Sequence, residues 1–73
     1  MDRLLAMQVF ATVAECGSFT AAAERLDLSR AMATRHVESL EQWLGARLLH
    51  RTTRRVSLTD AGAQCLRYSQ QML

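Results

Sequence analysis

The spacing of the glycines, in a chain without proline, is the feature that most limits how this sequence can fold. Proline is absent and only three glycines occur among the 73 residues. Because these two residues are the strongest terminators of helices and strands, the stretches between the glycines can continue as regular structure. Gly17 and Gly45 each follow a run of helix-forming residues and are placed as helix ends. The sequence therefore predicts a succession of helices in a chain long enough for one domain only.

A first helix is predicted from about Asp2 to Cys16. Its polar residues Gln8, Thr12 and Glu15 recur at helical spacing and form only a narrow stripe. Most of the circumference of this helix should therefore be buried.

A short second helix is predicted over residues 19–26, FTAAAERL, with Ser18 as its N-cap. Its apolar residues repeat at i, i+3, i+4 and i+7, which gives one buried face. That face consists of Phe19, Ala22, Ala23 and Leu26. Three consecutive alanines keep the helix thin, so another backbone can approach it closely. Asp27 and Leu28 should form a tight turn before Ser29, the next N-cap candidate.

A third helix is predicted from Arg30 to Leu44, with Gly45 as its end. Its buried stripe is expected to consist of Ala33, Val37, Leu40 and Leu44. Trp43 should pack at the edge of this stripe. A long helix, a short helix, a turn and a further helix with a polar face follow the order of a helix-turn-helix.

Two short strands and a final helix are predicted after Gly45. The strands are Arg47–His50 and Val56–Leu58, and RTTRR is the loop between them. Thr59 is placed as the N-cap of a helix that starts at Asp60, whose carboxylate suits a helix N-terminus. Two apolar stripes run along this helix: Ala61, Cys65, Tyr68 and Met72 form one, and Gly62, Leu66, Ser69 and Leu73 form the other. Such a helix can pack on its own domain with one stripe and expose the other.

Positive charge is concentrated in the middle of the chain, although the formal net charge is only +2. Residues 30–55 hold six arginines against two glutamates, a balance of +4. Residues 1–29 hold two arginines against four acidic residues, a balance of −2. All nine cations are arginines, and arginine suits forked recognition of phosphate and guanine. This distribution indicates a polyanionic partner.

Other kinds of site are not indicated by the sequence. Cys16 and Cys65 lie far apart outside any CxxC pattern, and we expect both to be small buried residues. His36 and His50 have no third ligand at metal-binding spacing. No catalytic constellation is visible, so we expect no metal, no cofactor and no enzyme activity. Neither a membrane span of about 20 apolar residues nor a signal peptide is visible, which favours a cytoplasmic location.

Two long segments resemble a known family. They are GSFTAAAERLDLS, residues 17–29, and TRHVESLEQWLGARLLHRTTRRVSLTDAG, residues 34–62. Both strongly resemble the N-terminal DNA-binding domain of LysR-type transcriptional regulators, in matching order and spacing. The resemblance implies a mainly α fold, a winged helix-turn-helix with a three-helix core, a two-stranded β wing and a C-terminal linker helix. It implies a DNA-binding domain over residues 1–58 and a linker or dimerisation helix over residues 59–73. A small-molecule effector would bind a further domain beyond this chain.

The start of the third helix departs from the usual family pattern. The family usually reads Ser-Gln-Pro-Ala where this chain reads Ser29, Arg30, Ala31 and Met32. Ala31 still suits a first helical turn, and Thr34 keeps a hydroxyl where the family usually has serine. Arg35 stands where the family also has arginine. The departures concern which bases are read.

The third helix is predicted to read base edges in the major groove. Arg30 and Arg35 can each donate two hydrogen bonds to guanine, worth about 1–3 kcal/mol of discrimination per pair. Thr34 can bond a base or place its methyl group against a thymine methyl. Met32 offers an apolar contact or turns inward. The predicted base-contacting residues are Arg30, Ala31, Met32, Thr34 and Arg35.

The loop between the strands is predicted to contact the DNA beside that groove. Arg51, Thr52 and Thr53 are interpreted as phosphate contacts, which position a protein without reading sequence. Arg54 or Arg55 could enter the minor groove, where a narrow A·T-rich segment concentrates negative potential. The family resemblance favours Arg54.

The start of the second helix is a further candidate for backbone contact. The N–H groups of Ser18, Phe19 and Thr20, together with two hydroxyls, suit an anion at a helix N-terminus. His36 is a candidate for another phosphate contact.

These features predict sequence-specific binding of double-stranded DNA as a homodimer on an interrupted, two-fold-related operator. The predicted dimerisation residues are Ala61, Cys65, Tyr68 and Met72. One alternative is that Arg30 and Arg35 merely form a solvated face with Glu38 and Glu41. Another is a protein-interaction module whose last helix is functional and whose basic loop is incidental. RNA binding is a third, but the four aromatic residues all fall at helical positions, unlike a base-stacking platform.

Overall fold

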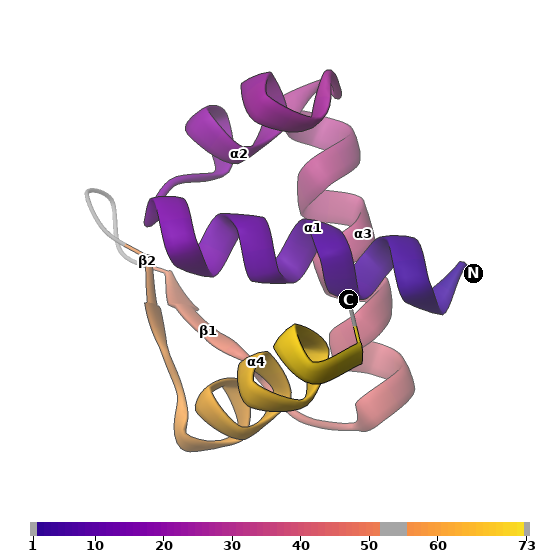
Figure 1. Ribbon diagram of the computed structural model, residues 1–73, viewed down its shortest axis with the longest axis vertical. Coiled ribbons are helices and arrows are strands. Elements are labelled where there is room, and N and C mark those ends of the chain that lie inside the picture. The colour runs from indigo at the N-terminus through magenta and orange to yellow at the C-terminus, as the bar shows by residue number, and fades with distance from the viewer. Residues whose placement is uncertain (1, 52–55, 73) are drawn as a thin grey trace.

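The computed structural model describes residues 2–51 and 56–72 of the chain. Within these ranges it contains, in order, α1 (Arg3–Cys16), α2 (Phe19–Leu26), α3 (Arg30–Leu44), β1 (Leu49–Arg51), β2 (Val56–Leu58) and α4 (Asp60–Met72). In Figure 1, α1 crosses the middle of the molecule, with α2 above it, α4 below it and α3 behind it. The two strands form an antiparallel ribbon at one side. The predicted mainly α fold with a two-stranded ribbon is confirmed.

The helices begin at hydroxyl or carboxylate caps. Ser18, Ser29 and Thr59 each accept a hydrogen bond from the N–H three residues on, at 2.9–3.2 Å, as the sequence predicts. Asp2 caps α1 in the same way, through the N–H of Leu5 at 3.0 Å. Each cap satisfies a donor that the first turn of a helix leaves unpaired.

The helices end where the sequence predicts. Gly17 and Gly45 both have a φ of 69° and close α1 and α3. Asp27 closes α2 in the same left-handed region, with a φ of 57°. The N–H groups of Asp27 and Leu28 bond back to carbonyls in the last turn of α2, which makes the predicted tight turn.

The core lies where α1, α2 and α3 meet, and β1 closes it. Its largest fully buried hydrophobic side chains are Val9, Phe10, Val13, Val37, Leu40, Leu48 and Leu49. The predicted buried stripe of α3 is confirmed at Ala33, Val37 and Leu40 but is wrong at Leu44, which is 42% exposed. Glu41, only 8% exposed, takes the buried place in this last turn, and Leu44 lies beyond the core. Trp43 is 49% exposed at the edge, with the guanidinium carbon of Arg3 4.5 Å from its ring centroid.

The first strand lies later in the chain than the predicted Arg47–His50. Leu48 and Leu49 are buried in succession, so the alternation expected of a strand does not hold before Leu49. The reason is that the backbone of Leu48 bonds outside the ribbon. Its N–H donates to the carboxylate of Glu41, and its carbonyl accepts from the N–H of Thr59 at 3.1 Å.

The second strand is confirmed at its predicted bounds. Leu49 lies opposite Leu58 and Arg51 opposite Val56 in the antiparallel register. Ser57 is exposed between two half-buried neighbours, which is the predicted alternation.

Helix α4 packs against α1 and β2 through small residues. Gly62 is buried, and a Cβ atom at this position would overlap the carbonyl oxygen of Leu48 and lie 3.2 Å from Cδ2 of Leu58. Only glycine therefore permits this close approach of α4 to the segment before β1. Ser69, which is fully buried, lies on the same inner face of α4 two turns after Gly62.

The two stripes predicted on α4 divide differently from the prediction. The inner face carries Gly62, Leu66 and Ser69, while Leu73 lies outside the described residues. The other stripe is split, because Ala61 and Cys65 are half-buried against the core. Tyr68 and Met72 are 65% and 62% exposed. The outer surface of α4 is therefore apolar only in its last two turns.

The two cysteines are less buried than the sequence predicts. Cys16 and Cys65 are free thiols and both are only partly buried. Burial raises the pKa of the Cys65 thiol, and its contact with the Ser69 hydroxyl at 4.0 Å partly opposes this shift. Over residues 2–51 and 56–72, no helix has both the length and the apolar character needed to cross a membrane.

Candidate nucleic-acid interface

The first half of α3 presents the residues predicted to read bases. Arg30, Ala31 and Arg35 are exposed, and Thr34 is half-buried. Met32 is 39% exposed, so it is turned toward solvent rather than into the core. Because residues four apart share a helix face, Arg30 lies above Thr34 and Ala31 above Arg35. The five side chains thus form one continuous surface over the first two turns of α3.

The arginines of this surface are not neutralised by the carboxylates of the same helix. Glu38 and Glu41 both form ion pairs with Arg51. Among the described residues, neither Arg30 nor Arg35 has an ion-pair partner. In the described residues, the ion pairs of Glu38 and Glu41 are therefore with other arginines and not with Arg30 or Arg35.

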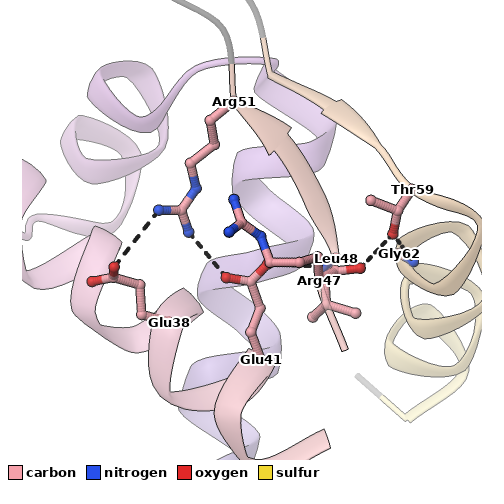
Figure 2. A network of polar contacts seen from close by, with 7 residues as sticks. All are labelled: Glu38, Glu41, Arg47, Leu48, Arg51, Thr59 and Gly62. Carbon is pink, nitrogen blue, oxygen red and sulfur yellow. Dashed lines mark hydrogen bonds and ion pairs between the residues drawn. The ribbon is translucent and has the colours of Figure 1, made fainter. Parts of the chain in front are cut away.

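A buried carboxylate joins α3 to β1 (Figure 2). Oε2 of Glu41 accepts the N–H of Leu48 at 2.7 Å and lies 3.8 Å from Nε of Arg47. Its other oxygen, Oε1, accepts a hydrogen bond from Nη2 of Arg51 at 3.2 Å. One side chain of α3 therefore contacts both the segment before the ribbon and the last residue of β1.

Arg51 is turned inward, which does not match the phosphate contact that the sequence predicts. Its side chain is 26% exposed, and Nη1 lies 3.8 Å from Oε2 of Glu38. Its guanidinium carbon lies 5.1 Å from the ring centroid of Phe19. The charge of Arg51 is thus already balanced by two carboxylates of α3.

The predicted anion site at the start of α2 is only partly open. The side chain of Phe19 belongs to the core and is 7% exposed. The hydroxyl of Ser18 accepts the N–H of Ala21, so it already serves as the cap. Thr20 is exposed and leaves a hydroxyl at this helix start. His36, the other candidate backbone contact, is half-buried on α3.

The remaining predicted contacts, Thr52, Thr53, Arg54 and Arg55, lie outside the described residues. The strand ends that flank them are placed. Arg51 pairs with Val56 in the ribbon, and Arg51 also contacts α2 through Phe19 and α3 through Glu38. The ribbon, α2 and α3 therefore meet at this one side chain.

An apolar groove of about 280 Å³ lies between α1, the end of α3 and α4. Its lining includes Met7, Leu44, Leu48, Ala61, Cys65 and Tyr68. Three of the four predicted dimerisation residues therefore border one groove.

A family model and curated relatives match this chain. The model described as "Bacterial regulatory helix-turn-helix protein, lysR family" matches residues 4–63. An HTH-type transcriptional regulator of Xanthomonas campestris pv. campestris (strain 8004) is 58% identical over 55 residues, or 75% of this chain and 16% of that protein. The HTH-type transcriptional activator AaeR of Escherichia coli (strain K12) is 50% identical over 62 residues, or 85% of this chain and 20% of that protein. The chain thus spans about a fifth of the length of the curated relatives it matches.

Solved structures match it over nearly the whole chain. The DNA-binding domain of CbnR, solved as a DNA complex, superposes with a TM-score of 0.93 at 38% identity, covering 99% of this chain and 82% of that one. The corresponding domain of BenM, in a complex with catB site 1 DNA, gives a TM-score of 0.92 at 33% identity, covering 99% and 79%.

Proposed function

Because the chain belongs to the lysR family of bacterial regulatory helix-turn-helix proteins, we propose that it binds double-stranded DNA sequence-specifically as part of a transcriptional regulator. The solved domains of CbnR and BenM, which share its fold, are DNA complexes. The relatives are named as transcriptional regulators, which supports a regulatory and not an enzymatic role, in the cytoplasm.

The observation that carries this proposal is the uncompensated charge on the first half of α3. Arg30 and Arg35 are exposed there, and no carboxylate pairs with either of them among the residues placed. A helix can enter the major groove, whose floor presents guanine O6 and N7 and whose walls are phosphates. We propose that Arg30, Thr34 and Arg35 contact bases, with Ala31 and Met32 beside them.

Contacts to the DNA backbone are proposed on both sides of α3. Thr20 and the capping Ser18 lie at the start of α2, which can hold a phosphate at a helix N-terminus. Residues 52–55 follow β1 and are proposed to meet phosphates and the minor groove, with Arg54 inserted.

We further propose a homodimer that meets a two-fold-related operator through two copies of α3. Tyr68, which borders the apolar groove, and Met72 are exposed on α4, and covering such a surface favours association. Two-fold symmetry in the protein would be mirrored by two half-sites in the DNA. We propose that a small-molecule effector would be bound by residues other than those of this chain, since its relatives are more than four times as long.

Selection from a random DNA pool followed by titration tests the proposal. We expect the selected duplexes to share two related half-sites. Affinity should fall steeply as salt is raised, because binding releases counterions from each neutralised phosphate. Failure to bind any duplex at low salt would reject DNA binding. A protein-interaction role would instead leave function intact in Arg30→Ala and Arg35→Ala and abolish it in Tyr68→Asp.

A further inference from the structure

We propose that Glu41 and Arg51 are positioning residues for DNA binding: their ion pair holds the β1–β2 ribbon at a fixed angle to α3. Arg51 then acts through the placement of the ribbon and not as a ligand of phosphate. This inference rests on the proposed DNA-binding function and concerns how the two DNA-facing parts of the chain are held together.

The first support is the way Glu41 divides its two oxygens. Oε2 binds the N–H of Leu48, just before β1, while Oε1 binds the guanidinium of Arg51, the last residue of β1. Two contacts at the two ends of one strand fix both its distance from α3 and its direction. Figure 2 shows Glu41 between these two partners.

The second support is the number of elements that Arg51 connects. Its two terminal nitrogens face Glu38 and Glu41 of α3, and its plane lies over the ring of Phe19 at the start of α2. Only a planar forked cation can make these contacts together. Because Arg51 is paired with Val56, it sets the position of this end of the ribbon relative to α2 and α3.

The third support is that a buried ion pair between Glu41 and Arg51 is not the simplest way to stabilise a small core. Burying a carboxylate is costly, and an apolar pair of similar volume is often as stable as a buried ion pair. Nε of Arg51 is also buried without a hydrogen-bond partner in the part of the chain the structure describes. A geometrical role in orienting the ribbon accounts for keeping charges at this place.

Positioning and direct phosphate contact predict opposite results for the loss of the Glu41 charge. If Arg51 were a phosphate ligand, Glu41→Gln would free it and tighten DNA binding. If the pair positions the ribbon, the same change should weaken binding although the protein becomes more positive. Glu38→Gln is the matched control, because it removes the same charge from the same helix at a site that is 57% exposed and 3.8 Å from Arg51.

The experiment measures the affinity of the chain and these two variants for one duplex selected by the wild-type chain and one unrelated duplex. For Glu38→Gln we expect roughly twofold tighter binding, the result of one less exposed negative charge. For Glu41→Gln we expect about tenfold weaker binding to the selected duplex. Binding by Glu41→Gln that is as tight as binding by Glu38→Gln would overturn the inference.

Arg51→Lys provides a second test of the inference, because this substitution does not change the charge. Lysine binds phosphate well as a point charge, so a phosphate ligand would tolerate this change. A positioning residue would not, and we expect about tenfold weaker binding. The double variant Glu41→Gln, Arg51→Lys should bind DNA no more weakly than the weaker-binding single variant, because both changes disrupt the same ion pair. Wild-type affinity in Arg51→Lys would also overturn the inference.

The stability of each variant is measured as well as its DNA binding, so that a loss of affinity caused by unfolding can be recognised. Thermal denaturation gives the folded fraction of each variant at the assay temperature, and each affinity is corrected for it. If the correction removes the whole loss for both Glu41→Gln and Arg51→Lys, their role is only structural and the inference is wrong. A wild-type chain that binds neither duplex at low salt rejects the proposed function itself.

Discussion

The two ends of α3 present opposite kinds of surface. At its start, Arg30 and Arg35 are exposed cations that no described carboxylate neutralises. At its end, Trp43 and Leu44 are about half exposed and lie near α1 and the apolar groove. The buried carboxylate of Glu41 lies near the C-terminal end, where it holds the ribbon.

The difference indicates that the two ends of one helix suit partners of different chemistry. The polar start suits phosphates and base edges, while the apolar end suits another protein surface. The start contributes little to the core beyond Ala33, so its side chains can change without much cost in stability. The end borders the apolar groove beside α4 and carries the buried Glu41, so changes there should alter stability or association. Effects of mutation should therefore separate along α3.

The largest expected effect is on stability, at the contact between α4 and the segment before β1. In Gly62→Ala the new methyl group would overlap the carbonyl oxygen of Leu48, which is backbone and cannot turn aside. We expect a loss of about 3 kcal/mol or more in the free energy of unfolding, measured by thermal or urea denaturation.

The matched control is Ala63→Ser, one residue further on the same helix and exposed. It should change stability by no more than about 0.5 kcal/mol. Equal stability of Gly62→Ala and the wild-type chain would show that α4 does not approach the ribbon as closely as described.

The next largest effect is on DNA affinity, at the start of α3. Arg30→Ala and Arg35→Ala should each lose about 1–3 kcal/mol of discrimination at one base pair, with little change in stability. Binding to duplexes with single base-pair substitutions would locate that base pair. Gln42→Ala, exposed near the other end of the same helix, should bind DNA as the wild-type chain does. If Gln42→Ala and Arg30→Ala were equally impaired, the two ends would not differ in function.

A smaller effect is expected on self-association, at the outer surface of α4. Tyr68→Asp places a charge on an exposed apolar surface beside the groove and should weaken the dimer roughly tenfold. Sedimentation over a range of concentrations measures this change. Gln70→Asp, exposed on the same helix, carries the same charge and should leave the dimer intact. Purely monomeric wild-type chain at high concentration would reject the dimer.

Local signals were enough to predict most of the fold. Ser18, Ser29 and Thr59 cap helices and Gly17 and Gly45 end them because each acts on its own backbone within a few residues. The same is true of the register of β2, where alternation of side chains follows from the geometry of a strand.

Most of the features that the sequence did not predict depend on contacts between residues far apart in the chain. Glu41 lies one turn after Val37, on the buried stripe itself, so helical spacing alone could have indicated a buried carboxylate. Its partner could not be predicted, because nothing in the string HRTTRR separates Arg51 from the arginines that follow it. The shift of β1 has the same origin, since the backbone of Leu48 is bonded to Glu41 and Thr59. The base-contacting residues of α3 remain a prediction that only DNA-binding measurements can test.

The smallest expected effect concerns the thiol of Cys65, which borders the groove at the apolar end. Burial raises its pKa, with the Ser69 hydroxyl opposing part of the shift, so the native thiol should stay protonated at neutral pH. Because only the thiolate reacts, iodoacetamide should modify the Cys16→Ser variant more slowly when folded than in urea. A raised native pKa also means that stability from this group is present below the unfolded pKa and is lost as pH rises through the native one.

The same reaction distinguishes the two ends of α3 once more. If dimerisation covers the groove, modification of Cys65 should slow as protein concentration rises, and Tyr68→Asp in the same background should abolish that dependence. Arg35→Ala should leave it unchanged, because this residue lies at the other end of the helix. Modification that is as fast in the folded chain as in urea would show that burial does not protect the thiol. Concentration dependence that survives in Tyr68→Asp would place the dimer contact elsewhere than the apolar end.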